Sequence, residues 1–185
     1  TGYDATGGTI SKNKKHVSET ELEDMKPFFV AGVFASNAKV SPPDDEHAAW
    51  YCLGDPTEGA LITLARKAKV EPIDIEEQYP ETKQYSFDSG RKRMSSIRPW
   101  GDKKHHYVFA KGAPESILDI CTEIWDNGHV RKLTEADKKF ILEYNEELAK
   151  NAMRNLSFAY KVVSDKHDPK KLTIEETESN LIYMG

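Results

Sequence analysis

The chain has 185 residues, of which 38% are hydrophobic and 31% are charged, a composition that supports one sizeable core and predicts one domain. Its net charge of −5 provides no general basic field for a polyanion, which argues against nucleic-acid binding. The longest apolar run, residues 28–35, is far shorter than the roughly twenty residues of a membrane helix, so no membrane insertion of this fragment is expected.

The cysteines and the chain ends indicate the context of the protein. Cys52 and Cys121 form neither a disulfide framework nor a metal-ligand spacing, which favours a reducing compartment. The chain opens at Thr1 without a targeting pattern, and residues 181–185 have the pattern of a buried strand that stops at the chain end. We therefore expect a piece of a longer protein.

The first part of the chain predicts two helices and one short strand. Residues 1–12 indicate a turn or open hairpin. Apolar side chains recur near helical spacing over residues 19–37, which predicts one core helix. Residues 50–53 predict a strand, and residues 57–68 predict a second helix.

The middle of the chain predicts a meander of strands. Three strand-like runs, residues 84–87, 94–98 and 105–110, are separated by turn residues, so they are expected to pair antiparallel. Pro114 suits the first turn of a short helix over residues 115–121. Residues 126–128, Asp-Asn-Gly, predict the tip of a further hairpin.

The last part predicts a long helix and another strand. Thr134 and Asp137 form a capping-box pattern for a helix that should end near Asn151. Residues 156–163 alternate as in a strand, and the whole pattern predicts an α+β fold, a mainly antiparallel sheet flanked by helices. The stripe of the long helix that is expected to face the core consists of Phe140, Ile141, Tyr144, Leu148 and Ala152.

Residues 54–59, Gly-Asp-Pro-Thr-Glu-Gly, form the first cluster that could carry chemistry. The glycines are spaced as in a phosphate-binding loop, but Ala60 and Leu61 stand where that loop needs Lys and then Ser or Thr. An ordinary phosphate cradle is therefore excluded. The carboxylates and the hydroxyl could accept from the amino group of a base and bond a sugar, and the alternative is a helix cap with an acidic first turn.

Residues 87–95 form the second cluster. Phe87 ends a predicted strand, and a turn then leads to three consecutive cations, Arg91, Lys92 and Arg93. A base stacked on an aromatic ring gains about 1–3 kcal/mol, and nearby cations can bind phosphate. The alternative is a solvated hairpin with Phe87 in the core.

Other residues give weaker signals. Lys111 ends a predicted strand beside the small residues Gly112 and Ala113, which could place an ammonium at the floor of a pocket, whereas an exposed edge lysine is the alternative. Arg154 lies between a predicted helix and a predicted strand, and by itself it does not indicate a binding site. His105 and His106 point to opposite faces of a strand, so metal binding is not expected.

Taken together and in this order, four segments resemble the nucleotide-binding domain of P-type cation-transporting ATPases, particularly the type II branch of calcium and sodium pumps. The segments are residues 54–61, 87–95, 111–115 and 154–161. The resemblance covers essentially the whole chain. It implies that residues 1–185 are a single nucleotide-binding domain excised from a larger multi-domain membrane pump.

The resemblance also implies roles for individual residues in binding ATP. Phe87 would stack on adenine, Glu58 would accept from the adenine amino group, and Lys111 would line the pocket floor. Ser89 is a further candidate contact, although calcium pumps often place an arginine there. The remaining candidates are Asp55 and Thr57 near the base and ribose, Lys92 and Arg154 at the phosphates, and Gly112, Ala113 and Leu156 in the pocket wall.

The sequence lacks the motif that is phosphorylated in this family, so phosphorylation is expected to take place in another domain. The family's phosphorylated aspartate lies in an Asp-Lys-Thr-Gly-Thr motif that is absent from the sequence. The resemblance implies ATP as the ligand, Mg²⁺ with that ATP in the full-length pump, and phosphorylation and actuator domains as partners. The resemblance also implies that the chain is a cytoplasmic domain of a multi-pass membrane protein. We expect it to be a monomer with no catalytic or metal-binding residues, and we do not expect it to hydrolyse ATP alone.

Two other classes of function stay open. A non-nucleotide protein-interaction module could use the acidic loop around Asp55 and the cations at residues 91–93. A free-standing phosphotransferase would need an acceptor or a metal loop, and neither occurs in the sequence.

Overall fold

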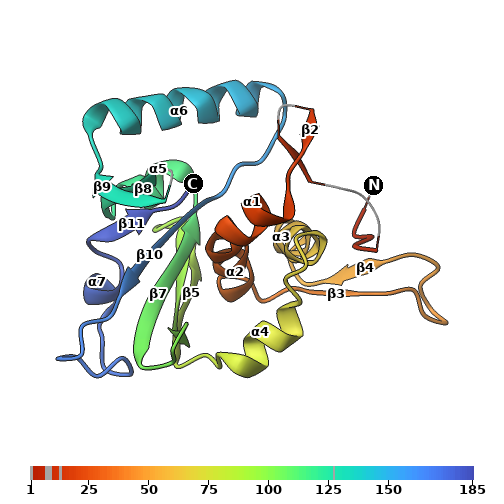
Figure 1. Cartoon of the computed structure of the whole chain (residues 1–185), viewed down its shortest axis with the longest axis horizontal. Helices are drawn as coiled ribbons and strands as arrows, with labels where there is room; N and C mark the ends of the chain where they lie inside the picture. The colour runs from red at the N-terminus through yellow and green to blue at the C-terminus, as the bar shows by residue number, and fades with distance from the viewer. Residues whose placement is uncertain (1, 7–9, 13, 127) are drawn as a thin grey trace. The chain divides into compact units, whose positions relative to one another are not determined.

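The computed structural model describes residues 2–6, 10–12, 14–126 and 128–185. The chain forms two compact units, residues 1–78 and residues 79–185, which we describe separately (Figure 1). That they act together as one nucleotide-binding domain stays a prediction.

The first unit begins with a small hairpin and two helices. Strands β1 (Ser11–Lys12) and β2 (Lys15–His16) pair antiparallel in a hairpin that lies later in the chain than the turn or open hairpin predicted over residues 1–12. Residues 1, 7–9 and 13 lie outside the described part. The prediction of a single helix over residues 19–37 is wrong. Two helices, α1 (Glu19–Asp24) and α2 (Lys26–Phe34), lie there, and Met25 between them is the C-cap of the first and the N-cap of the second. The break is explained by Pro27, which occupies the first turn of α2, since a proline ring fits the start of a helix better than its interior.

The rest of the first unit packs around α2. Helix α3 (Pro56–Lys67) confirms the predicted second helix, and the paired strands β3 (Lys39–Ser41) and β4 (Tyr51–Leu53) precede it. Helix α4 (Pro72–Gln78), which the sequence analysis missed, closes the unit. Buried side chains of α2 and α3, among them Phe34 and Ile62, form its core.

The second unit is built on a seven-stranded sheet with the order β5-β6-β7-β10-β11-β8-β9. The predicted meander is confirmed, because β5 (Lys83–Asp88), β6 (Arg93–Trp100) and β7 (His105–Gly112) pair antiparallel in sequence order. Strand β10 (Ser157–Val162), also predicted, lies antiparallel along β7.

The remaining strands complete the sheet. The hairpin of β8 (Cys121–Asp126) and β9 (His129–Lys132) confirms the predicted turn, of which residue 127 lies outside the described part. Strand β11 (Leu181–Tyr183) pairs antiparallel with β10 and parallel with β8, so one parallel pair stands in an otherwise antiparallel sheet. The predicted α+β class is therefore confirmed.

Three helices accompany this sheet. Helix α5 (Pro114–Leu118) begins at the predicted proline but stops earlier than predicted, because Cys121 already belongs to β8. Helix α6 (Glu135–Lys150) has the predicted Thr134–Asp137 capping box and its C-cap at Asn151. Helix α7 (Ile174–Thr177) is a single short turn capped by Thr173.

The predicted core stripe of α6 is partly wrong. Phe140 and Tyr144 are 69% and 54% exposed, and their rings stack on each other on the outside of the helix. Ile141 packs as predicted against the core cluster of the second unit, which includes Ile97, Val108, Ile117 and Leu181, and Leu142, which was not predicted, packs there too. The aromatic members of the predicted stripe thus lie at the surface, where an aromatic i, i+4 pair can contribute to helix stability without contact with the core.

Candidate functional site

The ends of four neighbouring strands lie together at one end of the sheet of the second unit, which we call the candidate edge. The register pairs Asp88 of β5 with Arg93 of β6, Arg93 with Gly112 of β7, and Gly112 with Ser157 of β10. Strand pairing therefore gathers segments that are far apart in the sequence. The predicted site residues brought to this edge are Phe87, Ser89, Lys92, Lys111, Gly112, Ala113, Arg154 and Leu156, whereas Asp55, Thr57 and Glu58 belong to the first unit.

Lys111 is the buried cation of this edge. Its side chain lies on β7 opposite Met94 of β6 and Phe158 of β10, and all three residues are at most 4% exposed. Because strand residues alternate, Lys111 points away from the core cluster that contains Ala110. The exposed-lysine alternative is thus wrong, and the apolar neighbours Met94 and Phe158 suit the aliphatic stem of the lysine.

Gly112 and Ala113 let β6 and β7 approach closely. A Cβ on Gly112 would lie 2.5 Å from the carbonyl oxygen of Lys92 and 2.6 Å from Cβ of Arg93. The backbone N–H of Ala113 donates to that same Lys92 carbonyl at 3.1 Å. Only glycine fits at position 112, and the contact fixes the backbone of Lys92 against the end of β7.

Phe87 is exposed rather than part of the core. Phe87 lies on β5 and is 62% exposed. It falls where the pairing of β5 with β6 shifts register, between Tyr85 and Asp88. The alternative in which Phe87 fills the core is therefore wrong. An aromatic ring that is held on a strand and open to solvent is available to stack on a flat ligand.

The turn between β5 and β6 presents Ser89 and Lys92. Ser89 is exposed, and the Lys92 ammonium lies 3.3 Å from a carboxylate oxygen of Glu115, both side chains being about half exposed. Lys92 has a left-handed backbone, with φ 53°, and its N–H donates to the Asp88 carbonyl at 2.7 Å. An exposed ion pair contributes little to stability, and Lys92 can give up Glu115 for another anion. Lys92 is therefore available to bind an anionic group of a ligand.

The two flanking arginines are occupied elsewhere. Arg91 and Arg93 both form ion pairs with the buried carboxylate of Glu178. Sequence reasoning missed Glu178 completely, because no local pattern links it to residues more than eighty positions earlier in the chain.

Arg154 and Leu156 lie on the loop that joins α6 to β10. Arg154 is exposed and Leu156 is half-buried. Between them, the side-chain amide of Asn155 donates to the Asn145 side chain of α6 at 2.9 Å, which fastens the loop to the helix. Asn155 was not among the predicted residues.

In the first unit, Asp55 caps α3. Its Oδ1 accepts from the backbone N–H of Thr57 at 2.7 Å and of Glu58 at 3.3 Å. The capping alternative proposed from the sequence is thus present in the structure. A contact of Asp55 or Thr57 with a nucleotide stays a prediction.

Glu58 fastens the chain that enters β3. Its Oε2 accepts from the backbone N–H groups of Asn37 at 2.7 Å and Ala38 at 3.1 Å. Nearby, a Cβ on Gly59 would lie 2.4 Å from the Cys52 sulfur, so the helix start packs tightly on β4. Desolvation by burial raises the pKa of the Cys52 thiol, which therefore stays protonated at neutral pH.

The histidines and the cleft elsewhere in the second unit contribute no residue to the candidate edge. Within the described residues, no group of three or more His, Cys, Asp or Glu side chains could hold a metal ion. His105 lies near Asp102 and Asp165, while His106 contacts Thr82. A cleft of about 200 Å³ at the opposite end of β7 is lined by Lys104, His106, Val163, Ser164, Asp165, His167 and Pro169, none of which is a predicted site residue.

Comparison with known proteins identifies the family. The profile of the P-type ATPase cytoplasmic domain N matches residues 24–185. The chain therefore belongs to this family, the N domain of P-type cation ATPases. Among its described residues, no helix is long and apolar enough to cross a membrane.

Named relatives agree with this assignment. The chain is 30% identical to a calcium-transporting ATPase of Bacillus subtilis over 185 residues, which is all of this chain and 20% of that protein. It is 36% identical over 132 residues to calcium-transporting ATPase 1 of Bacillus cereus, covering 71% of this chain and 14% of the relative. A cation-transporting ATPase of Synechocystis is 28% identical over 189 residues, covering all of this chain and 20% of that protein. The chain thus spans a fifth or less of the length of these relatives.

Proposed function

We propose that this chain binds ATP and presents it to a phosphorylation domain of a cation-transporting P-type ATPase. The observation that carries the proposal is the strand register, which brings exposed Phe87, buried Lys111 and exposed Lys92 to one edge of the sheet. An aromatic ring for the base and cations for the phosphates are the groups that a nucleotide requires.

Each candidate residue of the second unit has a role in this proposal. Phe87 stacks on adenine, Lys111 places its ammonium at the pocket floor, and Lys92 and Arg154 bind the phosphates. The close contact at Gly112 and Ala113 keeps the backbone near the ligand. Ser89 and Leu156 line the edge.

Phosphoryl transfer takes place outside this chain in our proposal. The aspartate that accepts the γ-phosphoryl belongs to a neighbouring phosphorylation domain, which works with an actuator domain in a multi-pass pump for calcium or another cation. The described residues contain no cluster that fits Mg²⁺, so we assign no residue of this chain to that ion. The ion would enter with the phosphates of ATP and neutralise their charge.

The experiment is a calorimetric titration of the 185-residue chain with ATP and AMP. We expect a dissociation constant for ATP on the order of 0.1–1 mM, or about −4 to −5 kcal/mol. Lys111→Ala should abolish binding without unfolding the chain, and Lys111→Met should do the same while keeping the apolar stem. Lys104→Ala, at the other end of β7, is the matched control and should bind ATP normally.

Phe87→Ala separates nucleotide binding from a protein-interaction function. Loss of the stacking partner should weaken ATP by about 1–3 kcal/mol. No heat of binding at millimolar ATP in the unmodified chain would refute the proposal, and partner-protein binding that is insensitive to Phe87→Ala would favour the interaction module.

A further inference from the structure

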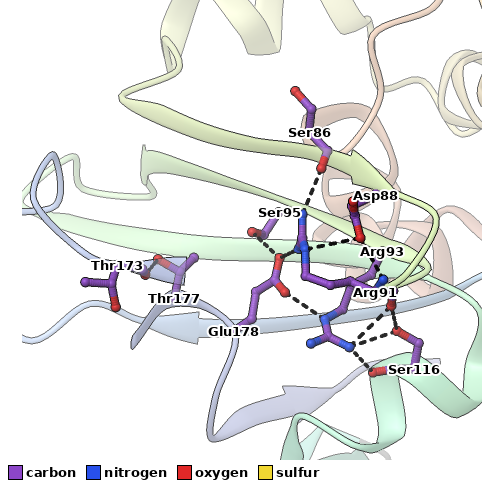
Figure 2. Close-up of polar contacts among 9 residues, drawn as sticks. All are labelled: Ser86, Asp88, Arg91, Arg93, Ser95, Ser116, Thr173, Thr177 and Glu178. Atoms are coloured by element: carbon purple, nitrogen blue, oxygen red, sulfur yellow. Dashed lines mark hydrogen bonds and ion pairs between the residues drawn. The ribbon is translucent and has the colours of Figure 1, made fainter. Parts of the chain in front are cut away.

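A buried carboxylate lies behind the turn that carries Ser89 and Lys92. Glu178, which follows the short helix α7, has a side chain that is only 2% exposed. It accepts from Arg91 Nη1, from Arg93 Nε at 2.7 Å and from Ser95 Oγ at 3.0 Å (Figure 2). One residue thus holds the last part of the β5–β6 turn and the start of β6.

The two arginines extend this hold to the backbone of the turn. Arg91 Nη2 donates to the Ser86 carbonyl at 3.0 Å, on the incoming strand. Arg93 Nη1 donates to the Ser116 hydroxyl at 3.0 Å, and that hydroxyl donates in turn to the Arg91 carbonyl. Figure 2 shows the Arg91 and Arg93 side chains meeting the Glu178 carboxylate, with Ser86 and Ser116 bonded to the two arginines.

Lys92 is the residue between the two fixed arginines. Its left-handed backbone is a sparsely populated conformation for a lysine, so the surrounding contacts must hold it there. With Arg91 and Arg93 turned toward Glu178, the Lys92 side chain is left on the other side, beside Glu115. Lys92 and its two neighbours thus pair with different carboxylates, Lys92 with Glu115 and the two arginines with Glu178.

We propose that Glu178 is a positioning residue for the phosphates of the bound nucleotide. It touches no ligand itself. By holding Arg91 and Arg93, it keeps the β5–β6 turn in the conformation in which Lys92 and Ser89 meet the phosphate chain. This inference rests on the proposed function and adds to it a residue that selects for the phosphates rather than for the base.

The test compares ATP with adenosine, which has the same base and ribose but no phosphates. In Glu178→Gln, we expect the dissociation constant for ATP to rise about five- to tenfold, as for the loss of one ordinary hydrogen bond. Adenosine binding should change less than about twofold, because adenosine has no phosphates for Lys92 and Ser89 to meet. Both constants are measured by NMR titration of the 185-residue chain.

Glu81→Gln is the matched control. Glu81 also pairs with an arginine of β6, Arg98 at 3.3 Å, and accepts from a β6 serine, Ser96 at 2.9 Å, but at the far end of the strand. Both substitutions should lower the unfolding midpoint. Only Glu178→Gln should lower the preference for ATP over adenosine.

Ser116→Ala keeps the test decisive if Glu178→Gln does not fold. It removes one hydroxyl that joins Arg91 to Arg93, and it should reduce the ATP preference in the same direction. An unchanged ratio of ATP to adenosine affinity in folded Glu178→Gln or Ser116→Ala overturns the positioning role and leaves the proposed function intact. If the unmodified chain binds neither ligand, the proposed function fails and this inference fails with it.

Discussion

Gly112→Ala tests the contact that joins the site to the sheet. The added methyl would lie 2.5 Å from the Lys92 carbonyl oxygen, about 0.9 Å short of the 3.4 Å at which ordinary contact begins. It would also lie 2.6 Å from Cβ and 2.9 Å from Cα of Arg93. Backbone atoms cannot rotate away, so β6 and β7 must separate at this end.

The cost of Gly112→Ala has two parts. Overpacking of a close contact costs about 1–3 kcal/mol. Separation of the strands also weakens the hydrogen bond from Ala113 N–H to the Lys92 carbonyl, which contributes about 1 kcal/mol. We expect the free energy of unfolding of the second unit to fall by about 2–4 kcal/mol.

Urea denaturation in a Trp50→Phe background, followed by the fluorescence of Trp100 and Trp125, both in the second unit, measures this loss. Gly90→Ala is the control, because a Cβ there would meet only a side-chain oxygen of Asp88, at 3.2 Å. A loss below about 0.5 kcal/mol in Gly112→Ala, the size of an ordinary surface substitution, would refute the reasoning. So would an equal loss in Gly90→Ala.

Two further predictions concern stability. Glu58→Ala should destabilise the first unit by about 1–3 kcal/mol in urea, because the N–H groups of Asn37 and Ala38 lose their acceptor, and an unchanged midpoint would contradict this. Burial raises the pKa of the Cys121 thiol from about 9 to about 12, so the folded chain keeps a proton that the unfolded chain loses between these values. The stabilisation from this proton is complete below about pH 9 and should disappear between about pH 9 and 12, at up to about 1.4 kcal/mol per pH unit. Relative to Cys121→Ala, the unmodified chain should therefore lose extra stability as the pH rises from 9 to 10, and parallel pH profiles of the two proteins would disprove the assignment.

Local signals explain which parts of the fold were predictable from the sequence. The β5–β7 meander has turn residues between its strands, and the α6 capping box needs only Thr134 and Asp137. The start of α2 also had a local signal in Pro27, which the apolar periodicity of residues 19–37 obscured. Patterns that lie within a few residues of each other were thus sufficient for most of the second unit.

Long-range contacts explain what the sequence did not predict. The parallel pairing of β11 with β8 joins segments about sixty residues apart, and no turn specifies it. The surface position of Phe140 and Tyr144 depends on which face of α6 meets the core, which periodicity alone leaves open. Glu178 could not be associated with Arg91 and Arg93 for the same reason, although Phe87, Lys92 and Lys111 could be named from their segments.

The most direct test of the central claim is a map of backbone amide shifts as ATP is added to the isotope-labelled chain. We predict that, within the second unit, the largest changes occur at residues 87–92, 111–113 and 154–156, the strand ends and loops of the candidate edge. Changes confined to the opposite end of the sheet, at residues 104–106 and 163–169, would contradict the account, as would the absence of any change at millimolar ATP.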